Sequence, residues 1–172
     1  MIFSSDNWAG ASPEVLAALA ASGAAGPLPA YGDDEITRRL EARFADAFER
    51  EVDVFLVATG TAANALSVAA FSPPWGQLVI HEEGHLAVDE CGAPEFFAGT
   101  RTVTLPGRFG KLDADDLARR LARWPIGVHH GRPAVLSITQ ANECGRVYTP
   151  AEVAALAGTA HAHGLAVHMD GS

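Results

Sequence analysis

The chain has 172 residues, of which 48% are hydrophobic and 19% charged, with a formal net charge of −9. This length and composition fit one domain with a sizeable core, and the lack of a Lys/Arg-rich run argues against a nucleic-acid or membrane-surface partner. Its two cysteines form neither a disulfide framework nor a zinc pattern, so we expect a reducing, cytoplasmic setting.

Two helices are predicted in the first fifty residues. Ser12 and Pro13 are typical of a helix start, and this alanine-rich helix should end near Gly23. After a loop, a second helix should run from about residue 35 to residue 50. Apolar residues recur every four positions along it and predict one buried stripe, made of Ile36, Leu40, Phe44 and Phe48.

The stretch Asp53 to Phe71 predicts a strand, a tight turn and a helix. An apolar run at residues 54–58 precedes Thr59-Gly60-Thr61, and small helix-compatible residues follow. The unpaired N–H groups of such a helix start suit a phosphate. A plain strand–turn–helix without a ligand explains the same pattern, so the signal alone is weak. Residues 54–80 carry no charge, but polar residues and prolines interrupt them, which favours buried elements over a membrane helix.

The remaining chain alternates strands with helices. Strands are predicted at residues 77–80, 101–105, 134–139 and 165–169. Helices are predicted at 86–91, after the cap Asp113, and between the capping box at Thr149 and the stop signal Gly164. This order predicts an α/β fold with a mainly parallel sheet covered by helices on both faces.

Ligands of such sheets bind at the carboxyl ends of the strands. The polar candidates gather at these positions: Thr59 to Thr61, His81 to His85, Gln140 to Glu143, and Asp170. This convergence, more than any single motif, indicates a site.

The same segments, in the same order, resemble the threonine aldolase family, which depends on pyridoxal phosphate (PLP) and has the aspartate-aminotransferase fold, fold type I. The matching motifs are Ser5-Asp6, the YGDD segment from Tyr31 to Asp34, FLVATGTAAN from Phe55 to Asn64, His85, and the VHMDG segment from Val167 to Gly171. The resemblance covers nearly the whole chain, and YGDD with TGTxAN and a late HMDG is a specific combination.

The resemblance implies a role for each of these residues. Gly60 and Thr61 would hold the cofactor phosphate, Asp170 would pair with the pyridine nitrogen, and His85 would stack on the ring and serve as an acid or base. Ser5 would help to bind the substrate carboxylate. In the family the equivalent of Tyr31 reaches a neighbouring subunit, which implies a homodimer or homotetramer. Taken singly, each residue also fits an ordinary structural role.

Two departures from the family pattern stand out. Many members carry a histidine in the loop after the fourth strand, where this chain has Glu143, so the base at the substrate hydroxyl could be Glu143, His85 or a water. The family's Schiff-base lysine has no counterpart: the only lysine, Lys111, precedes a helix away from the strand ends. We therefore expect residues 1–172 to be an amino-terminal segment plus part of the PLP-binding large domain, without the carboxyl-terminal domain and inactive alone.

The function that the resemblance implies is cleavage of β-hydroxy-α-amino acids such as threonine, allo-threonine and phenylserine to glycine and an aldehyde. Alternatives are another PLP-dependent β-eliminating lyase, an aminotransferase relative, or a non-catalytic phosphate-binding α/β module. The histidines at 129, 130, 161, 163 and 168 lack a metal-like spacing, so no metal site is predicted.

Overall fold

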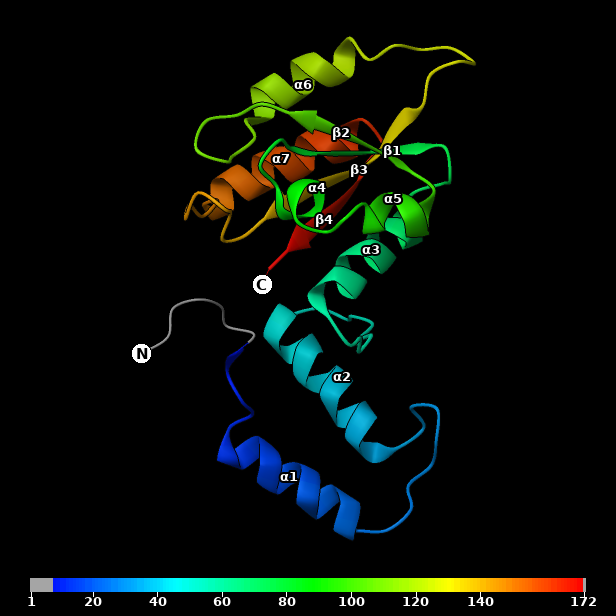
Figure 1. Ribbon diagram of the computed structural model, residues 1–172, viewed down its shortest axis with the longest axis vertical. Helices are drawn as coiled ribbons and strands as arrows, with labels where there is room; N and C mark the ends of the chain where they lie inside the picture. Colours follow the sequence, from blue (N-terminus) through cyan, green and yellow to red (C-terminus); the bar gives the residue numbers. More distant parts are fainter. Residues whose placement is uncertain (1–7, 172) are drawn as a thin grey trace. The chain divides into compact units, whose positions relative to one another are not determined.

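The computed structural model describes residues 8–171 of the chain. The chain divides into two units, residues 1–56 and 57–172. The first unit contains α1 (Pro13–Ala24) and α2 (Glu35–Phe48), shown in blue and cyan in Figure 1. Ser12 caps α1, as predicted, and the Asp34 carboxylate caps α2 by accepting from the N–H groups of Ile36 and Thr37. Glu49, in the left-handed conformation, ends α2 two residues earlier than predicted.

Two predictions for this part of the chain are wrong. The apolar stripe of α2 is not buried: none of its residues is, and Phe48 is 62% exposed. Residues 54–58 form no strand, and Phe55 is 84% exposed. Both errors have one physical cause. Amphipathic helices and strands bury their apolar side, or complete their backbone hydrogen bonds, only against a partner; among the described residues no α2 residue is buried and residues 54–58 pair with no strand.

The second unit is the predicted α/β fold. Its elements are α3 (Gly60–Phe71), β1 (Gly76–His81), α4 (His85–Val88), α5 (Ala93–Ala98), β2 (Arg101–Leu105), α6 (Ala114–Ala122), β3 (Arg132–Thr139), α7 (Pro150–Ala162) and β4 (Ala166–Asp170). The four strands form one parallel sheet in the order β2-β1-β3-β4.

Helices cover both faces of this sheet, as predicted (Figure 1). On one face, Leu117 of α6 and Leu156 of α7 pack with Val79 and Leu136 of the strands. The other face joins α3, α4 and α5 to the sheet through a second core, made of Val68, Leu78, Ile80, Leu86, Ala98 and Val135. Since side chains alternate along a strand, β1 and β3 contribute buried residues to both cores, which explains their apolar runs at residues 78–80 and 134–136.

The segment after β1 contains two short helices instead of the single predicted helix at residues 86–91. Cys91 and Gly92 both have positive φ, 51° and 74°, and their left-handed conformation turns the chain from α4 into α5. Nothing in the sequence except Gly92 signals this turn. Within the described residues, no helix is long and apolar enough to cross a bilayer.

Tyr148 connects two loops of the second unit. Its buried hydroxyl accepts a hydrogen bond from the Leu112 backbone N–H at 2.8 Å, and burial raises the pKa of this phenol. The Gln140 side chain accepts from the Tyr148 N–H at 2.7 Å and donates to the Tyr148 carbonyl at 3.1 Å. The loop that follows β3 is therefore held at both of its ends.

Lys111 is held at the start of α7. Its ammonium group forms an ion pair with Glu152, the capping-box glutamate, and donates to the Val147 carbonyl at 3.1 Å. The hydrogen bond from Lys111, followed by those from Thr149, lowers the pKa of Glu152 from 4.5 to about 2. This stabilisation is present above pH 4.5 and is lost as the pH falls towards 2, because only the ionised carboxylate accepts these bonds.

We expect Tyr148→Phe to lower the free energy of unfolding by about 1–3 kcal/mol, because it leaves the buried Leu112 N–H without an acceptor. Chemical denaturation measures this loss. Tyr31→Phe, which alters the exposed second tyrosine, is the matched control and should change stability little. Equal stability of the two variants would show that the Tyr148 hydroxyl contributes nothing.

We also expect Lys111→Met to raise the pKa of Glu152 from about 2 towards its ordinary value of 4.5, but not to reach it, because Thr149 still donates to the carboxylate. A carboxyl NMR titration measures the shift, with Arg120→Met on the exposed side of α6 as control. An unchanged midpoint in Lys111→Met would contradict the ion pair.

Candidate functional site

The candidate site lies at the carboxyl edge of the sheet. Because the strands are parallel, the segments after β1 and β3 and the end of β4 meet at this edge. The amino-terminal turns of α3 contribute from the sequence before β1. Most of the predicted site residues belong to these four segments, and all of these segments lie in the second unit.

The start of α3 has the features of an anion site. The Thr59 side chain caps the helix by accepting from the Ala62 N–H at 3.1 Å, and the Thr59 carbonyl accepts from Ala63. By helix geometry the N–H groups of Gly60 and Thr61 have no acceptor within the helix, and the helix dipole adds positive potential there. A Cβ atom at Gly60 would meet nothing within 4 Å, so the space beside it is open.

A buried polar network joins α3 to the sheet and to the segment after α4. The Asn64 side-chain amide donates to Glu90 Oε1 at 2.9 Å and to Asp170 Oδ2 at 3.1 Å. All three residues are at most 6% exposed. Asn64 lies one turn after Gly60, about 6 Å along the helix axis. The network therefore holds the predicted pyridine partner, Asp170, close to the predicted phosphate site.

His85 and Glu143 form a hydrogen-bonded pair. His85 Nδ1 lies 3.0 Å from Glu143 Oε1, and both side chains are about 40% exposed. Since a carboxylate only accepts, this contact places a hydrogen on Nδ1. The other ring nitrogen, Nε2, faces the buried Glu90 carboxylate at 4.0 Å. Ligand atoms of His85, Asp89 and Glu143 lie within 4.8 Å of one another, a spacing that could hold a cation, although exposed acidic groups commonly gather without one.

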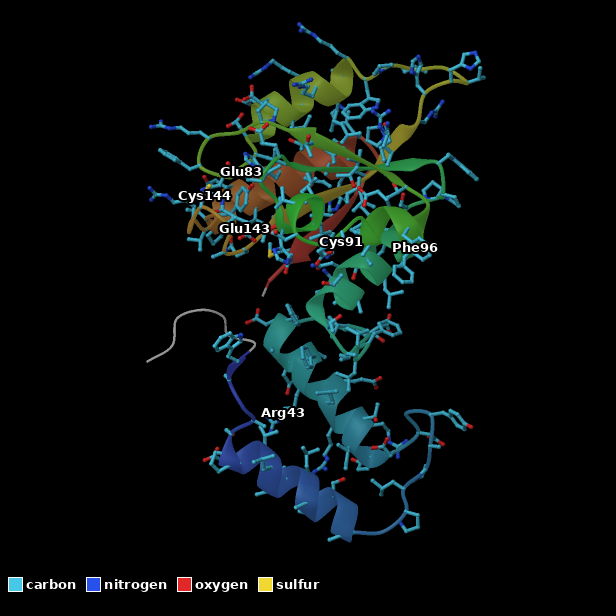
Figure 2. The ribbon with its side chains drawn as sticks, in the orientation of Figure 1. Arg43, Glu83, Cys91, Phe96, Glu143 and Cys144 are labelled. Carbon is cyan, nitrogen blue, oxygen red and sulfur yellow. The ribbon has the colours of Figure 1, made fainter. Side chains whose placement is uncertain are left out.

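Hydrogen bonds of the Asn142 side chain stabilise the loop that carries Glu143. Asn142 accepts from the N–H groups of Cys144 and Arg146, and its amide donates to the Phe109 carbonyl at 3.0 Å. The Cys144 thiol donates to Glu83 Oε2 at 3.0 Å, and Figure 2 shows Glu83, Glu143 and Cys144 close together. Two contacts, His85–Glu143 and Glu83–Cys144, thus tie the segment after β1 to the loop after β3.

Further polar residues on β3 and β4 lie beside Asp170. Ser137 and His168 are register partners, and the Ser137 hydroxyl lies 2.9 Å from His168 Nδ1. Burial lowers the pKa of His168, which favours the neutral ring. Thr139 is the register partner of Asp170, and its hydroxyl is buried without a hydrogen-bond partner among the described residues.

The structure thus brings together five predicted site residues: Gly60, Thr61, His85, Glu143 and Asp170. Ser5 lies outside the described residues, and Tyr31 belongs to the first unit, where it is fully exposed. Lys111 is engaged by α7, as described above.

Sequence reasoning missed the roles of two residues, Asn64 and Glu90. Asn64 ends the TGTAAN motif, and that position was its only signal. No sequence pattern indicated a role for Glu90, because a glutamate in a short helical segment usually faces solvent.

Comparison with known proteins shows the family of this chain. The model of the beta-eliminating lyase family matches residues 3–172. The low-specificity L-threonine aldolase of Pseudomonas aeruginosa is 40% identical over 171 residues, which cover 99% of this chain and 49% of that protein. A solved threonine aldolase structure from Leishmania major has a TM-score of 0.85 and 26% identity, covering 94% of this chain and 47% of the other.

A more distant likeness concerns the fold alone. The ureidoglycine–glyoxylate aminotransferase of Bacillus subtilis has a TM-score of 0.64 at 14% identity, covering 91% of this chain and 38% of the other. This chain spans about half the length of the curated relatives it matches. The family is PLP-dependent. Because the family model covers nearly every residue, this chain belongs to the beta-eliminating lyase family.

Proposed function

We propose that this chain forms the cofactor-binding part of a PLP-dependent aldolase that cleaves β-hydroxy-α-amino acids to glycine and an aldehyde. Threonine, allo-threonine and phenylserine are the proposed substrates. The observation that carries this proposal is the hydrogen-bonded His85–Glu143 pair, which lies at the same edge of the sheet as Asp170 and offers two groups that can accept a proton. The 40% identity to an L-threonine aldolase supports it.

The residues present fit the cofactor. Open space borders Gly60 at a helix start that suits a phosphate. Asp170 offers a buried carboxylate for a protonated ring nitrogen, and the hydroxyl of Thr139, its neighbour on β3, has no partner among the described residues. When bound, PLP supplies an electron sink for the bonds at Cα of an amino acid.

Each side chain then has a role that follows from its surroundings. Gly60 and Thr61 would bind the phosphate through their backbone N–H groups. Asp170, held by Asn64, would keep a proton on the pyridine nitrogen through its negative charge. His85, partly exposed at the start of α4, would lie against the ring face and exclude water from it.

Glu143 is the proposed acceptor of the β-hydroxyl proton, directly or through a water. Loss of this proton lets the Cα–Cβ bond break with release of an aldehyde. His85 is the alternative base: with a hydrogen on Nδ1, it would accept the proton at Nε2 and could pass its Nδ1 hydrogen to Glu143. Such a pair acts as a unit, so the effects of removing either member should not add.

Several further features belong to the same proposal. Ser5 and Tyr31 would contact the substrate. The complete enzyme would be a homodimer or homotetramer, which the exposed apolar stripe of α2 supports, and would be cytoplasmic, which its two free cysteines support. Residues 1–172 would be the amino-terminal segment plus part of the large domain. The Schiff-base lysine would lie outside them, because Lys111 is bound to α7.

β-Elimination is the second candidate, because the family that this chain belongs to is described by that reaction. The two reactions give different products: aldol cleavage releases glycine and an aldehyde, whereas β-elimination of a serine-like amino acid releases a keto acid and ammonia. An aminotransferase would instead require a keto-acid co-substrate, and a phosphate-binding module would form no product.

The experiment that tests the proposal assays the complete enzyme with PLP and threonine. We expect glycine and acetaldehyde in equal amounts. The 172-residue chain alone should give no more product than PLP without protein. Keto acid and ammonia from serine, with no glycine from threonine, would overturn the aldolase assignment in favour of β-elimination.

We expect Glu143→Gln in the complete enzyme to retain its PLP absorbance and its binding of glycine, which lacks the hydroxyl group. Its kcat for threonine cleavage should fall at least roughly tenfold, since loss of a general base commonly costs 10²–10⁴-fold. Glu82→Gln, which alters an exposed glutamate three residues before His85, is the control. A wild-type rate in Glu143→Gln across pH 6–9 would leave His85 as the base.

A further inference from the structure

Glu90 is a buried carboxylate that the proposed mechanism does not use. The residue is 3% exposed and its side chain is completely buried. Its Oε1 accepts from Asn64, whereas its Oε2 has no hydrogen-bond partner among the described residues. A carboxylate is expensive to remove from water unless it is paired. Its retention in the interior therefore requires a reason beyond ordinary packing.

The Asn64 amide gives the first part of that reason. An asparagine amide has two N–H hydrogens, and here one points to Glu90 and the other to Asp170. With both acceptors present, two hydrogen bonds fix the plane of the Asn64 amide. Without Glu90, the amide could turn about its bond to Asp170 and would no longer define the direction of that carboxylate.

His85 gives the second part. Its Nδ1 contacts the half-exposed Glu143 at 3.0 Å, and its Nε2 lies 4.0 Å from Glu90 Oε1. The imidazole is thus placed between a carboxylate on a surface loop and one in the interior. The same Glu90 oxygen faces both Asn64 and His85, so one atom relates the histidine to the amide that holds Asp170.

The backbone explains how Glu90 reaches this position. It directly precedes the two left-handed residues, Cys91 and Gly92, and its carbonyl accepts from the Ala93 N–H at 2.9 Å. This turn places the Glu90 side chain against α3, while Asp89, one residue earlier, is exposed. The short α4 and the sharp turn after it are therefore required for the contact with Asn64.

We propose that Glu90 is a positioning residue that fixes Asn64 and His85, and thereby sets the orientation in which Asp170 would meet the ring nitrogen, and His85 the ring face, of their common ligand. The inference rests on the proposed function, because that ligand is PLP. Glu90 acts through its neighbours and makes no contact with the substrate.

The test compares Glu90→Ala and Glu90→Gln with Glu95→Gln in the complete enzyme. Glu95 is the matched control, because it also has a buried oxygen without a partner but contacts neither Asn64 nor His85 in the hydrogen bonds and ion pairs of the described residues. Four quantities are measured: the visible circular dichroism of bound PLP, the Kd for PLP, and the kcat and KM for threonine. Thermal melting without PLP checks the fold of each variant.

We expect Glu90→Ala to change the circular dichroism per bound PLP and to lower kcat at least about tenfold, the scale for losing one hydrogen bond to a charged group. KM should change less than kcat. Glu90→Gln keeps an oxygen that accepts from Asn64 but removes the charge facing His85, so it should recover the dichroism while its kcat remains below wild type. Glu95→Gln should match wild type in all four quantities.

The possible results distinguish failure of the proposed function from failure of the role proposed for Glu90. If wild type binds no PLP or does not cleave threonine, the proposed function fails. If wild type does both and the Glu90 variants match Glu95→Gln, only the role of Glu90 fails. Should Glu90→Ala not fold, Glu90→Gln decides: a kcat equal to that of wild type overturns the inference, and a reduced kcat with normal melting supports it.

Discussion

The two hydrogen bonds of the Asn64 amide are the constraint on which the rest of the site depends. They join α3, the segment after α4 and the end of β4, which are far apart in sequence, in the buried layer between the helices and the sheet. In this layer an unpaired amide or carboxylate costs far more than at the surface. These hydrogen bonds thereby connect the helix that begins at Gly60 to the carboxylate of Asp170.

The sequence predicted the architecture well because alternation and capping are local signals. The predicted strands agree with β1 to β4 within two residues at each end, and Ser12, Asp113 and Thr149 all act as caps. The unpartnered elements were predicted poorly. A strand at residues 54–58 and a buried face of α2 both need a neighbouring element. A periodic apolar pattern indicates that such a neighbour is needed, but it does not identify the neighbour.

The residues of the candidate site divide in the same way, into those that local sequence signals predict and those that depend on contacts between distant residues. The helix start at Gly60 and the strand-end segments that contain His85, Glu143 and Asp170 could be named from the sequence pattern, and the resemblance to threonine aldolases then implied a role for each residue. Glu90 could not be named, because its burial depends on a turn formed by two left-handed residues, one of which is a cysteine. Nor could the sequence show that His85 and Glu143 are in contact, since 58 residues separate them.

The hydrogen bond from Cys144 to Glu83 affects the reactivity of an exposed thiol. Cys144 is exposed, yet the pKa of its thiol is raised, chiefly by this hydrogen bond and then by desolvation and the nearby carboxylates. The thiolate is the form that attacks alkylating reagents and peroxides, so a raised pKa should slow both reactions at neutral pH. We therefore expect the contact that ties the two loops together also to slow covalent modification of this sulfur.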